Sequence, residues 1–188
     1  MELTLHAPAK VNLTLIVGAR RDDGYHDVST VMQAVGLYDT LTLTEGGSGL
    51  TMTCTDPDLP TDGSNLVLRA AALFCQELHL PVPDLHLHLQ KRIPSQAGLG
   101  GGSSDAAAVL RALRSLYAPN LPDAELERMA AALGSDVPFF IRGGTALATG
   151  RGERPSAPCA RSASRIVHTA LSGGTARSKL LHSAAATA

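Results

Sequence analysis

The feature that most restricts how this chain can fold is a glycine-rich run at Pro94 to Ala108, which reads PSQAGLGGGSSDAAA. Leu85 to Leu89 alternate with polar residues before it, which predicts a strand, and an apolar stripe at helical spacing follows it as far as Tyr117. Glycine permits positive φ and lets main-chain amides approach a ligand closely. A helix start adds unpaired N–H groups and partial positive charge. The order strand, glycine-rich loop, helix therefore predicts an anion-binding loop, with phosphate as the usual occupant.

The loop differs from two familiar phosphate-binding motifs. No lysine precedes Ser103, which excludes a Walker A loop. The glycine spacing fits G-x-G-x-x-G poorly, and the strand before the loop alternates with polar residues, which disfavours a dinucleotide fold. A packed or flexible loop without a ligand is the alternative interpretation. The strand before the loop and the apolar helix after it favour phosphate binding.

Composition excludes several classes of protein. The 188 residues are 44% hydrophobic but only 3% aromatic, so we expect a core of Ala, Leu and Val. A net charge of −1 gives no general attraction to nucleic acid or to an anionic membrane. Neither an apolar run of roughly 18 residues nor a signal-peptide pattern is present, so no membrane association is expected. Three widely spaced cysteines (Cys54, Cys75 and Cys159) favour the reducing cytoplasm over a disulfide framework or a zinc site.

The first third of the chain is rich in strand signals. Alternating or apolar segments occur at 3–5, 11–17, 28–37, 39–44 and 50–55. The first two predict either a pair of strands or one strand broken at Pro8. Glycine-containing turns between the later segments favour an antiparallel meander.

Three helices are predicted from apolar residues at helical spacing. Ser64 or Asn65 can cap the first, which ends before Pro81. The second follows the glycine-rich loop, and the third ends at Gly134. A short strand follows within 143–152. The sequence therefore predicts a two-layer α+β domain rather than a regular βαβ series.

Composition changes after Glu153. No acidic or aromatic residue follows, and from Pro155 onward four basic residues are scattered among Ser, Ala, Thr and Gly (Arg161, Arg165, Arg177 and Lys179). We therefore expect one domain at 1–154 and a disordered tail at 155–188. Scattered charges without aromatic residues give little support for nucleic-acid binding by this tail.

Lys10, Asn12 and Asp136 are candidate reactive residues. Lys10 and Asn12 are two positions apart in a predicted strand and so share a face. Asp136 follows a helix-ending glycine, where a capping role is the simplest interpretation. If these residues face the loop, the carboxylate can accept the proton of an acceptor hydroxyl, and the lysine can hold it ionised and neutralise developing charge. That arrangement suits phosphoryl transfer from a nucleotide with Mg²⁺.

The glycine-rich segment resembles the corresponding motif of the galactokinase, homoserine, mevalonate and phosphomevalonate (GHMP) kinases. Four more segments match in order: APAKVNLTL at 7–15, DGYHDVSTVMQ at 23–33, SNLVLRA at 64–70 and LGSDVPFF at 133–140. The resemblance covers about residues 5–154. It implies a ribosomal protein S5 domain 2-like fold and ATP with Mg²⁺. It also implies transfer of the γ-phosphoryl group to the 2-hydroxyl of 4-diphosphocytidyl-2-C-methyl-D-erythritol, a small-molecule substrate of the non-mevalonate isoprenoid pathway.

The resemblance also implies roles for individual residues. Asp136 matches the catalytic base and Lys10 its catalytic partner. The residues that match the ATP phosphate loop are Pro94, Ser95, Gln96, Ala97, Gly98, Leu99, Gly100, Gly101, Gly102, Ser103 and Ser104, with Ser103 or Ser104 as a Mg²⁺ or phosphate contact. A Cβ at Gly100 is expected to intrude on backbone that must approach phosphate.

Two further groups carry over from the resemblance. Asn65 and Lys91 match the adenosine pocket, although a helix cap and a lysine at a strand end explain them almost as well. Asn12, Tyr25 and His26 match positions that hold the cytidine diphosphate substrate, where Tyr25 can stack on cytosine. No protein metal site is expected.

The C-terminal part departs from the family pattern. Family members continue into a second α/β domain, which nothing from about Pro158 onward matches. A truncated or out-of-frame end explains this departure. Two alternatives stay open: another GHMP kinase acting on a smaller alcohol, and a non-catalytic nucleotide-binding fragment. Tyr25 and His26 favour the cytidine substrate over the first, and the presence of Lys10 and Asp136 favours retained chemistry over the second.

Overall fold

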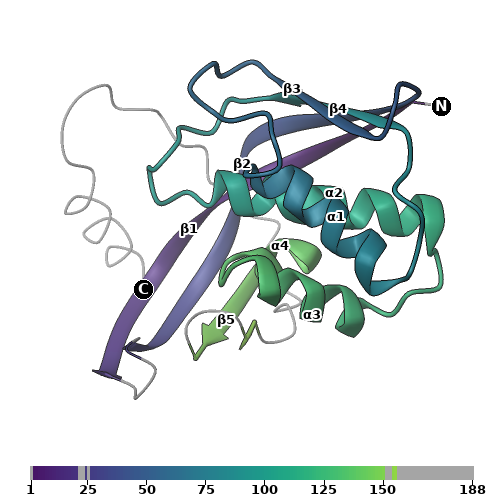
Figure 1. Ribbon diagram of the computed structural model, residues 1–188. Helices are drawn as coiled ribbons and strands as arrows, with labels where there is room; N and C mark the ends of the chain where they lie inside the picture. The colour runs from purple at the N-terminus through teal and green to yellow at the C-terminus, as the bar shows by residue number, and fades with distance from the viewer. Residues whose placement is uncertain (1, 21–23, 25, 151–153, 156–188) are drawn as a thin grey trace.

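The computed structural model describes residues 2–20, 24, 26–150 and 154–155, which form one mixed sheet and four helices (Figure 1). The strands are β1 (Glu2–Arg20), β2 (His26–Glu45), β3 (Leu50–Cys54), β4 (Leu85–Gln90), β5 (Thr145–Thr149) and β6 (Arg154–Pro155). The helices are α1 (Leu66–Glu77), α2 (Gly101–Tyr117), α3 (Asp123–Leu133) and α4 (Val137–Arg142).

β1 and β2 form a long antiparallel hairpin whose register pairs Glu2 with Thr44 and Arg20 with His26. Pro8 pairs with Tyr38 but Ala9 pairs with Val35, so β2 bulges at this point. The bulge lets β1 pass Pro8 without ending, because an irregular ladder position needs no amide from proline. Of the two predicted alternatives, the single strand is the nearer, but the break expected at Pro8 is wrong, because β1 continues through Pro8 with only a shift in its pairing.

The second edge of β2 is shared by two strands. β1 runs along the first edge, whereas β4 pairs with residues 40–45 and β5 with residues 30–33, both antiparallel. Residues 34–39 therefore lie in a break between β4 and β5. The chain leaves β4 at this break and enters the glycine-rich loop, so the break positions the loop beside the centre of β2.

The predicted antiparallel meander is wrong at β3. This strand pairs parallel with β4, which lies between β3 and β2. The alternation in LTMTCT identified a strand, but it carries no information about which neighbour the strand pairs with. A parallel pair needs a crossover connection, and α1 supplies it between β3 and β4.

The helices begin and end largely where their sequence signals lie. Of the two predicted caps for α1, Asn65 is used: its Oδ1 accepts a hydrogen bond from the Val67 amide at 2.9 Å. α3 ends at Gly134, where φ is 170°, an extended conformation open to any residue. The sequence interpretation missed α4, because six residues with Pro138 in the first turn are too few for a periodic pattern.

The core lies between the sheet and the helices, which cover one face (Figure 1). Leu41, Leu43 and Leu87 from the strands pack with Phe74 of α1 and Leu110 of α2, all at most 2% exposed. On the opposite face, Thr51 and Thr53 hydrogen-bond to the rings of His86 and His88. The predicted two-layer α+β class is confirmed. The predicted tail, apart from Pro155 in β6, lies outside the described residues.

Candidate active site at the glycine-rich loop

The N-terminus of α2 presents free backbone amides. Gly100 is the N-cap, no side chain caps the helix, and the first helical hydrogen bond runs from the Ser104 amide to the Gly100 carbonyl at 2.9 Å. The amides of residues 101–103 therefore have no acceptor within the helix. The loop before them turns through positive φ at Gly98 and Gly100. Such a helix start suits an anion, because the amides and the helix dipole both favour negative charge.

The glycines of the loop serve two different purposes. A Cβ on Gly100 would lie 2.9 Å from Cζ of Phe140 and 3.1 Å from Cγ of Lys10, so the protein itself fills that space. A Cβ on Gly102 would meet nothing within 4 Å. Packing against Phe140 and Lys10 is thus one reason for glycine at position 100, and the expected interference with phosphate stays a prediction. Gly102, like Gly98, faces open space.

Lys10 and Asp136 meet at this loop. Lys10 Nζ lies 3.2 Å from Asp136 Oδ2 and donates to Asn12 Oδ1, also at 3.2 Å. The Lys10 side chain is 7% exposed and that of Asp136 is 31% exposed, so the carboxylate can still reach a ligand. The Lys10 amide donates to the Leu99 carbonyl at 2.9 Å, which fixes β1 to the loop. Asp136 occupies the N-cap position of α4 but makes no side-chain capping bond, so the ion pair is its stronger partner.

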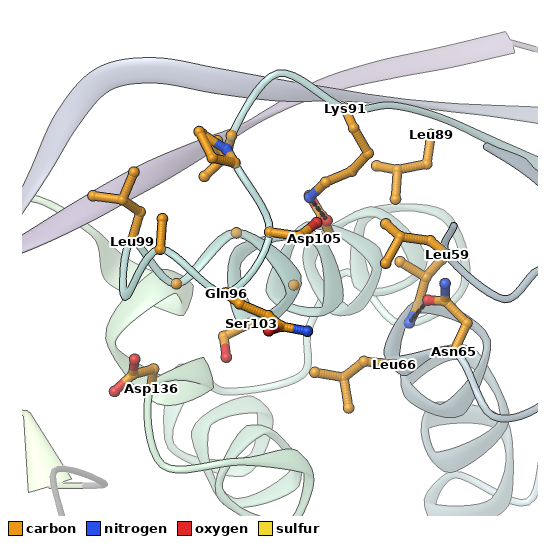
Figure 2. A pocket seen from close by; sticks show the side chains of 18 of the residues that line it. Leu59, Asn65, Leu66, Leu89, Lys91, Gln96, Leu99, Ser103, Asp105 and Asp136 are labelled. Carbon is orange, nitrogen blue, oxygen red and sulfur yellow. Dashed lines mark hydrogen bonds and ion pairs between the residues drawn. The ribbon is translucent and has the colours of Figure 1, made fainter. Parts of the chain in front are cut away.

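A cavity of about 570 Å³ lies beside the loop. Pro94 to Ser103 all line it, together with Lys10, Asn65, Lys91 and Asp136. Figure 2 shows Asp136 and Ser103 at one end and Leu59, Leu66 and Leu89 towards the other. The free amides lie at one end of the cavity, and the other end combines leucine side chains with Asn65, which suits a ligand with a charged tail and a flat, largely apolar group.

Some predicted site residues do not line this cavity. Ser104 is 1% exposed, is not part of the cavity wall, and its Oγ has no hydrogen-bond partner. Ser103 is therefore the better candidate for a phosphate or Mg²⁺ contact. His26 lies near the turn of the β1–β2 hairpin, with Nδ1 3.2 Å from the Gly18 carbonyl, and neither His26 nor Asn12 lines the cavity. Tyr25 lies outside the described residues.

Asn65 and Lys91 line the cavity but are also engaged within the protein. Asn65 caps α1 and donates from Nδ2 to the Pro60 carbonyl at 2.6 Å. Lys91 Nζ forms ion pairs with Asp39 and Asp105. Burial lowers the pKa of Lys91, but Asp105 and Asp39 more than offset this, so its pKa is raised and the ammonium persists. Sequence reasoning missed both carboxylates; Asp105 adjoins the motif, whereas no signal distinguished Asp39 from other strand residues.

Comparison with known proteins agrees with this geometry. Residues 65–144 match the family described as GHMP kinases N terminal domain. This part of the chain is a GHMP kinase N-terminal domain. The match spans the capped start of α1, the glycine-rich loop and all of α4, so it includes most of the cavity wall described above.

Several curated relatives of this GHMP domain are named 4-diphosphocytidyl-2-C-methyl-D-erythritol kinase. The protein from Streptomyces coelicolor is 47% identical over 157 residues, which are 82% of this chain and 52% of the relative. The protein from Synechococcus is 49% identical over 150 residues, or 80% of this chain and 48% of the relative. The chain thus spans about half the length of the curated relatives it matches.

Solved structures agree with the fold of the GHMP domain. The crystal structure of 4-(cytidine 5'-diphospho)-2C-methyl-D-erythritol kinase is similar with a TM-score of 0.70 and 44% identity, over 82% of this chain and 54% of that one. The Methanococcus jannaschii mevalonate kinase gives a TM-score of 0.63 at 16% identity, over 83% of this chain and 55% of that one, and supports the fold alone.

The described ranges hold neither a membrane-spanning helix nor a cluster of metal-binding side chains. None of the helices seen there is long and apolar enough to cross a membrane. No three His, Cys, Asp or Glu side chains there gather in a way that could hold a metal ion.

Proposed function

We propose that this chain is the nucleotide-binding half of an ATP-dependent kinase that phosphorylates the 2-hydroxyl of 4-diphosphocytidyl-2-C-methyl-D-erythritol. The observation that carries the proposal is the Lys10–Asp136 ion pair at 3.2 Å, beside free amides at the start of α2. The names of the relatives at 47% and 49% identity support the choice of substrate. The free thiols of Cys54 and Cys75 are compatible with a reducing cytoplasm.

Different groups of the chain have different roles in the proposed phosphoryl transfer. The amides of residues 101–103 hold the phosphate oxygens, and the helix dipole adds to this attraction. Asp136 accepts the proton of the acceptor hydroxyl as that oxygen attacks the γ-phosphorus. The bond between the γ-phosphorus and the bridging oxygen of ATP breaks, ADP leaves with that oxygen, and the proton stays on the carboxyl group. Lys10 pairs with this carboxylate before the reaction and offsets negative charge at the phosphoryl group during it.

Mg²⁺ fits this site as a companion of the nucleotide. Cavity oxygens available to it are the Ser103 hydroxyl and the partly exposed Asp136 carboxylate. Mg²⁺ commonly binds through one or two protein oxygens together with substrate phosphates. When bound, it would neutralise charge on the phosphates. The amides and Lys10 would still orient the nucleotide.

The acceptor side of the site depends on three residues. Asn12 contacts Lys10 and so lies beside the reacting groups. Tyr25 and His26 stay proposed contacts for the cytidine diphosphate group; of the two, only His26 is described, and it begins β2 next to the turn of the β1–β2 hairpin. Competition by cytidine nucleotides tests these contacts, because a kinase whose substrate is homoserine or mevalonate needs no site for a nucleobase.

A coupled assay of ADP release tests the proposed function. The chain and a fusion carrying the second half of the Streptomyces coelicolor relative are each incubated with MgATP and 4-diphosphocytidyl-2-C-methyl-D-erythritol, with homoserine and mevalonate as alternative acceptors. Release of ADP with the cytidine substrate alone supports the proposal. Release with a smaller alcohol favours another GHMP kinase. ATP binding without ADP release by either protein favours a non-catalytic fragment.

We expect Asp136→Asn in the active protein to reduce kcat by about a hundredfold or more, the scale of general-base catalysis, and to leave ATP affinity nearly unchanged. The change removes the proton acceptor while keeping shape and the oxygen near Lys10. Steady-state kinetics and calorimetric titration with ATP give the two quantities. Full turnover in this variant would remove Asp136 from the mechanism.

A further inference from the structure

Three ionisable side chains form a buried cluster beneath the glycine-rich loop. Lys91 Nζ lies 2.5 Å from Asp39 Oδ2 and 2.8 Å from Asp105 Oδ2. The side chains of Lys91, Asp39 and Asp105 are 8%, 0% and 2% exposed. A charge buried away from water costs free energy unless an opposite charge is close to it. We therefore expect small changes in the geometry of the cluster to be destabilising. The proposed reaction uses neither carboxylate.

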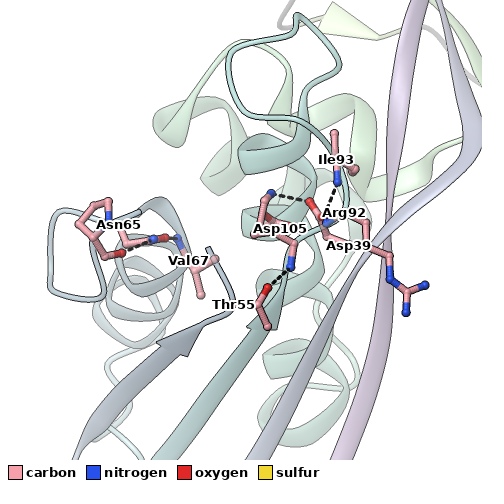
Figure 3. Close-up of polar contacts among 9 residues, drawn as sticks. Asp39, Thr55, Asn65, Val67, Arg92, Ile93 and Asp105 are labelled. Carbon is pink, nitrogen blue, oxygen red and sulfur yellow. Dashed lines mark hydrogen bonds and ion pairs between the residues drawn. The ribbon is translucent and has the colours of Figure 1, made fainter. Parts of the chain in front are cut away.

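The cluster joins three parts of the fold. Asp39 belongs to β2 at the break between β4 and β5, Lys91 follows β4 directly, and Asp105 lies on the second turn of α2. Asp39 Oδ1 also accepts the amides of Arg92 at 2.5 Å and Ile93 at 2.8 Å (Figure 3). The start of the loop is thus held to the sheet by three hydrogen bonds to one carboxylate.

Lys91 connects Asp39 to the start of α2. Its ammonium packs beneath the first residue of α2, since a Cβ on Gly101 would lie 3.2 Å from Nζ. Its bond to Asp105 adds a second connection to the same helix. Movement of the ammonium would therefore shift the residues whose amides are free, 101–103.

We propose that Asp39 is a positioning residue for nucleotide binding, which holds the free amides of α2 in place through Lys91 and the backbone at 92–93. The inference rests on the proposed function for its ligand. Lys91 and Asp105 line the cavity and can touch a ligand themselves, whereas Asp39 does not line it. An effect of Asp39 on nucleotide affinity must therefore pass through the cluster, which makes it the informative residue.

The test compares Asp39→Ala, Asp39→Asn and a control, Met52→Ala, in the full chain. Met52 is a core residue on β3, 7% exposed and outside the cluster, so its truncation destabilises the fold without altering these contacts. Binding of the ATP analogue AMP-PNP with Mg²⁺ is measured by calorimetry under conditions where each variant is folded. Hydrogen–deuterium exchange of residues 94–104 is measured without nucleotide.

We expect Asp39→Ala to weaken AMP-PNP binding about tenfold or more, the size expected when a buried charged hydrogen bond is lost, and to speed exchange in residues 94–104. Asp39→Asn keeps an oxygen for the Arg92 and Ile93 amides and should recover part of both effects. Met52→Ala should lower the melting temperature and leave affinity within about twofold, because its loss does not reach the cluster. Equal affinity in Asp39→Ala and wild type, or an equal loss in Met52→Ala, overturns the inference.

Two outcomes separate this inference from the proposed function. If Asp39→Ala does not fold, Asp39→Asn decides: weaker binding with faster exchange supports positioning, and unchanged values overturn it. If the wild-type chain binds no AMP-PNP, the proposed function fails, and exchange at 94–104 in Asp39→Asn still decides whether Asp39 orders the loop.

Discussion

Gly100 and Gly102 lie in the same motif, but glycine is favoured at the two positions for different structural reasons. Gly100 has φ of 72° and would press a Cβ against Phe140, whereas Gly102 is helical and faces the cavity. We therefore expect Gly100→Ala to lower the free energy of unfolding by about 2 kcal/mol. Gly102→Ala should leave it unchanged or raise it by up to about 1 kcal/mol, because alanine favours a helix.

The same pair separates folding from ligand binding. Gly102→Ala should weaken AMP-PNP binding, because its methyl group occupies space beside the free amides. Chemical denaturation gives the stabilities and calorimetry the affinities. Wild-type affinity in Gly102→Ala would show that phosphate does not lie over this residue.

Asp105 should make stability depend on pH. Its pKa is raised to about 7, chiefly by burial and further by Asp39, although Lys91 lowers it. In the unfolded chain the group loses its proton near its ordinary pKa of 3.8, so between these two pKa values the folded state binds more protons. The contribution of Asp105 to the free energy of unfolding therefore falls as pH rises from about 4 to about 7, by at most about 1.4 kcal/mol per pH unit.

Asp105→Asn isolates this contribution, because the amide does not titrate. Denaturation of both proteins at pH 5 and pH 7.5, without metal ions, should show wild type losing stability relative to the variant as pH rises. Parallel pH profiles for the two proteins would contradict the assignment.

At the scale of elements, α1 depends on a cap that also borders the cavity. Asn65→Ala should cost about 1 kcal/mol, because the Val67 amide loses its acceptor. Asn65→Asp keeps that acceptor but loses the amide that donates to Pro60, and should preserve most of the helix stability. Thermal unfolding measures both. If Asn65→Asp is stable yet binds AMP-PNP weakly, the side-chain amide contributes to the adenosine pocket as well as to the cap.

Elements whose signals are local could be predicted from the sequence, and those set by distant contacts could not. β4, α2 and the cap at Asn65 follow from alternation, helical spacing and side-chain chemistry. The placement of β3 beyond β4 depends on a crossover, which alternation does not encode. α4 was missed because it is shorter than two helical turns.

In the candidate site, too, residues in local motifs could be predicted, whereas residues placed by distant contacts could not. The loop and the pair Lys10 and Asp136 were identified from motifs, and the structure places them together. Asp39 was not identified, because its partners Arg92 and Ile93 are more than fifty positions away in sequence. The role of Phe140 beside Gly100 likewise depends on packing between α4 and the loop.

At the scale of the whole molecule, the outer half of the β1–β2 hairpin exposes apolar side chains. Leu15, Ile16 and Val17 are 57%, 66% and 58% exposed. Exposed apolar surface of this kind promotes association. We expect the chain to self-associate as concentration rises, and the double variant Leu15→Lys with Ile16→Lys to reduce this while keeping AMP-PNP affinity. Sedimentation velocity over a concentration series measures the effect; identical profiles for both proteins would contradict it.

The Lys10–Asp136 ion pair joins the first strand to a helix near the end of the described chain. During synthesis on the ribosome, the lysine and the glycine-rich loop emerge well before the carboxylate. A nascent chain released before α4 would therefore have the proposed phosphate loop but not the proposed proton acceptor. The Lys10–Asp136 pair forms only once almost all of the described chain has been made.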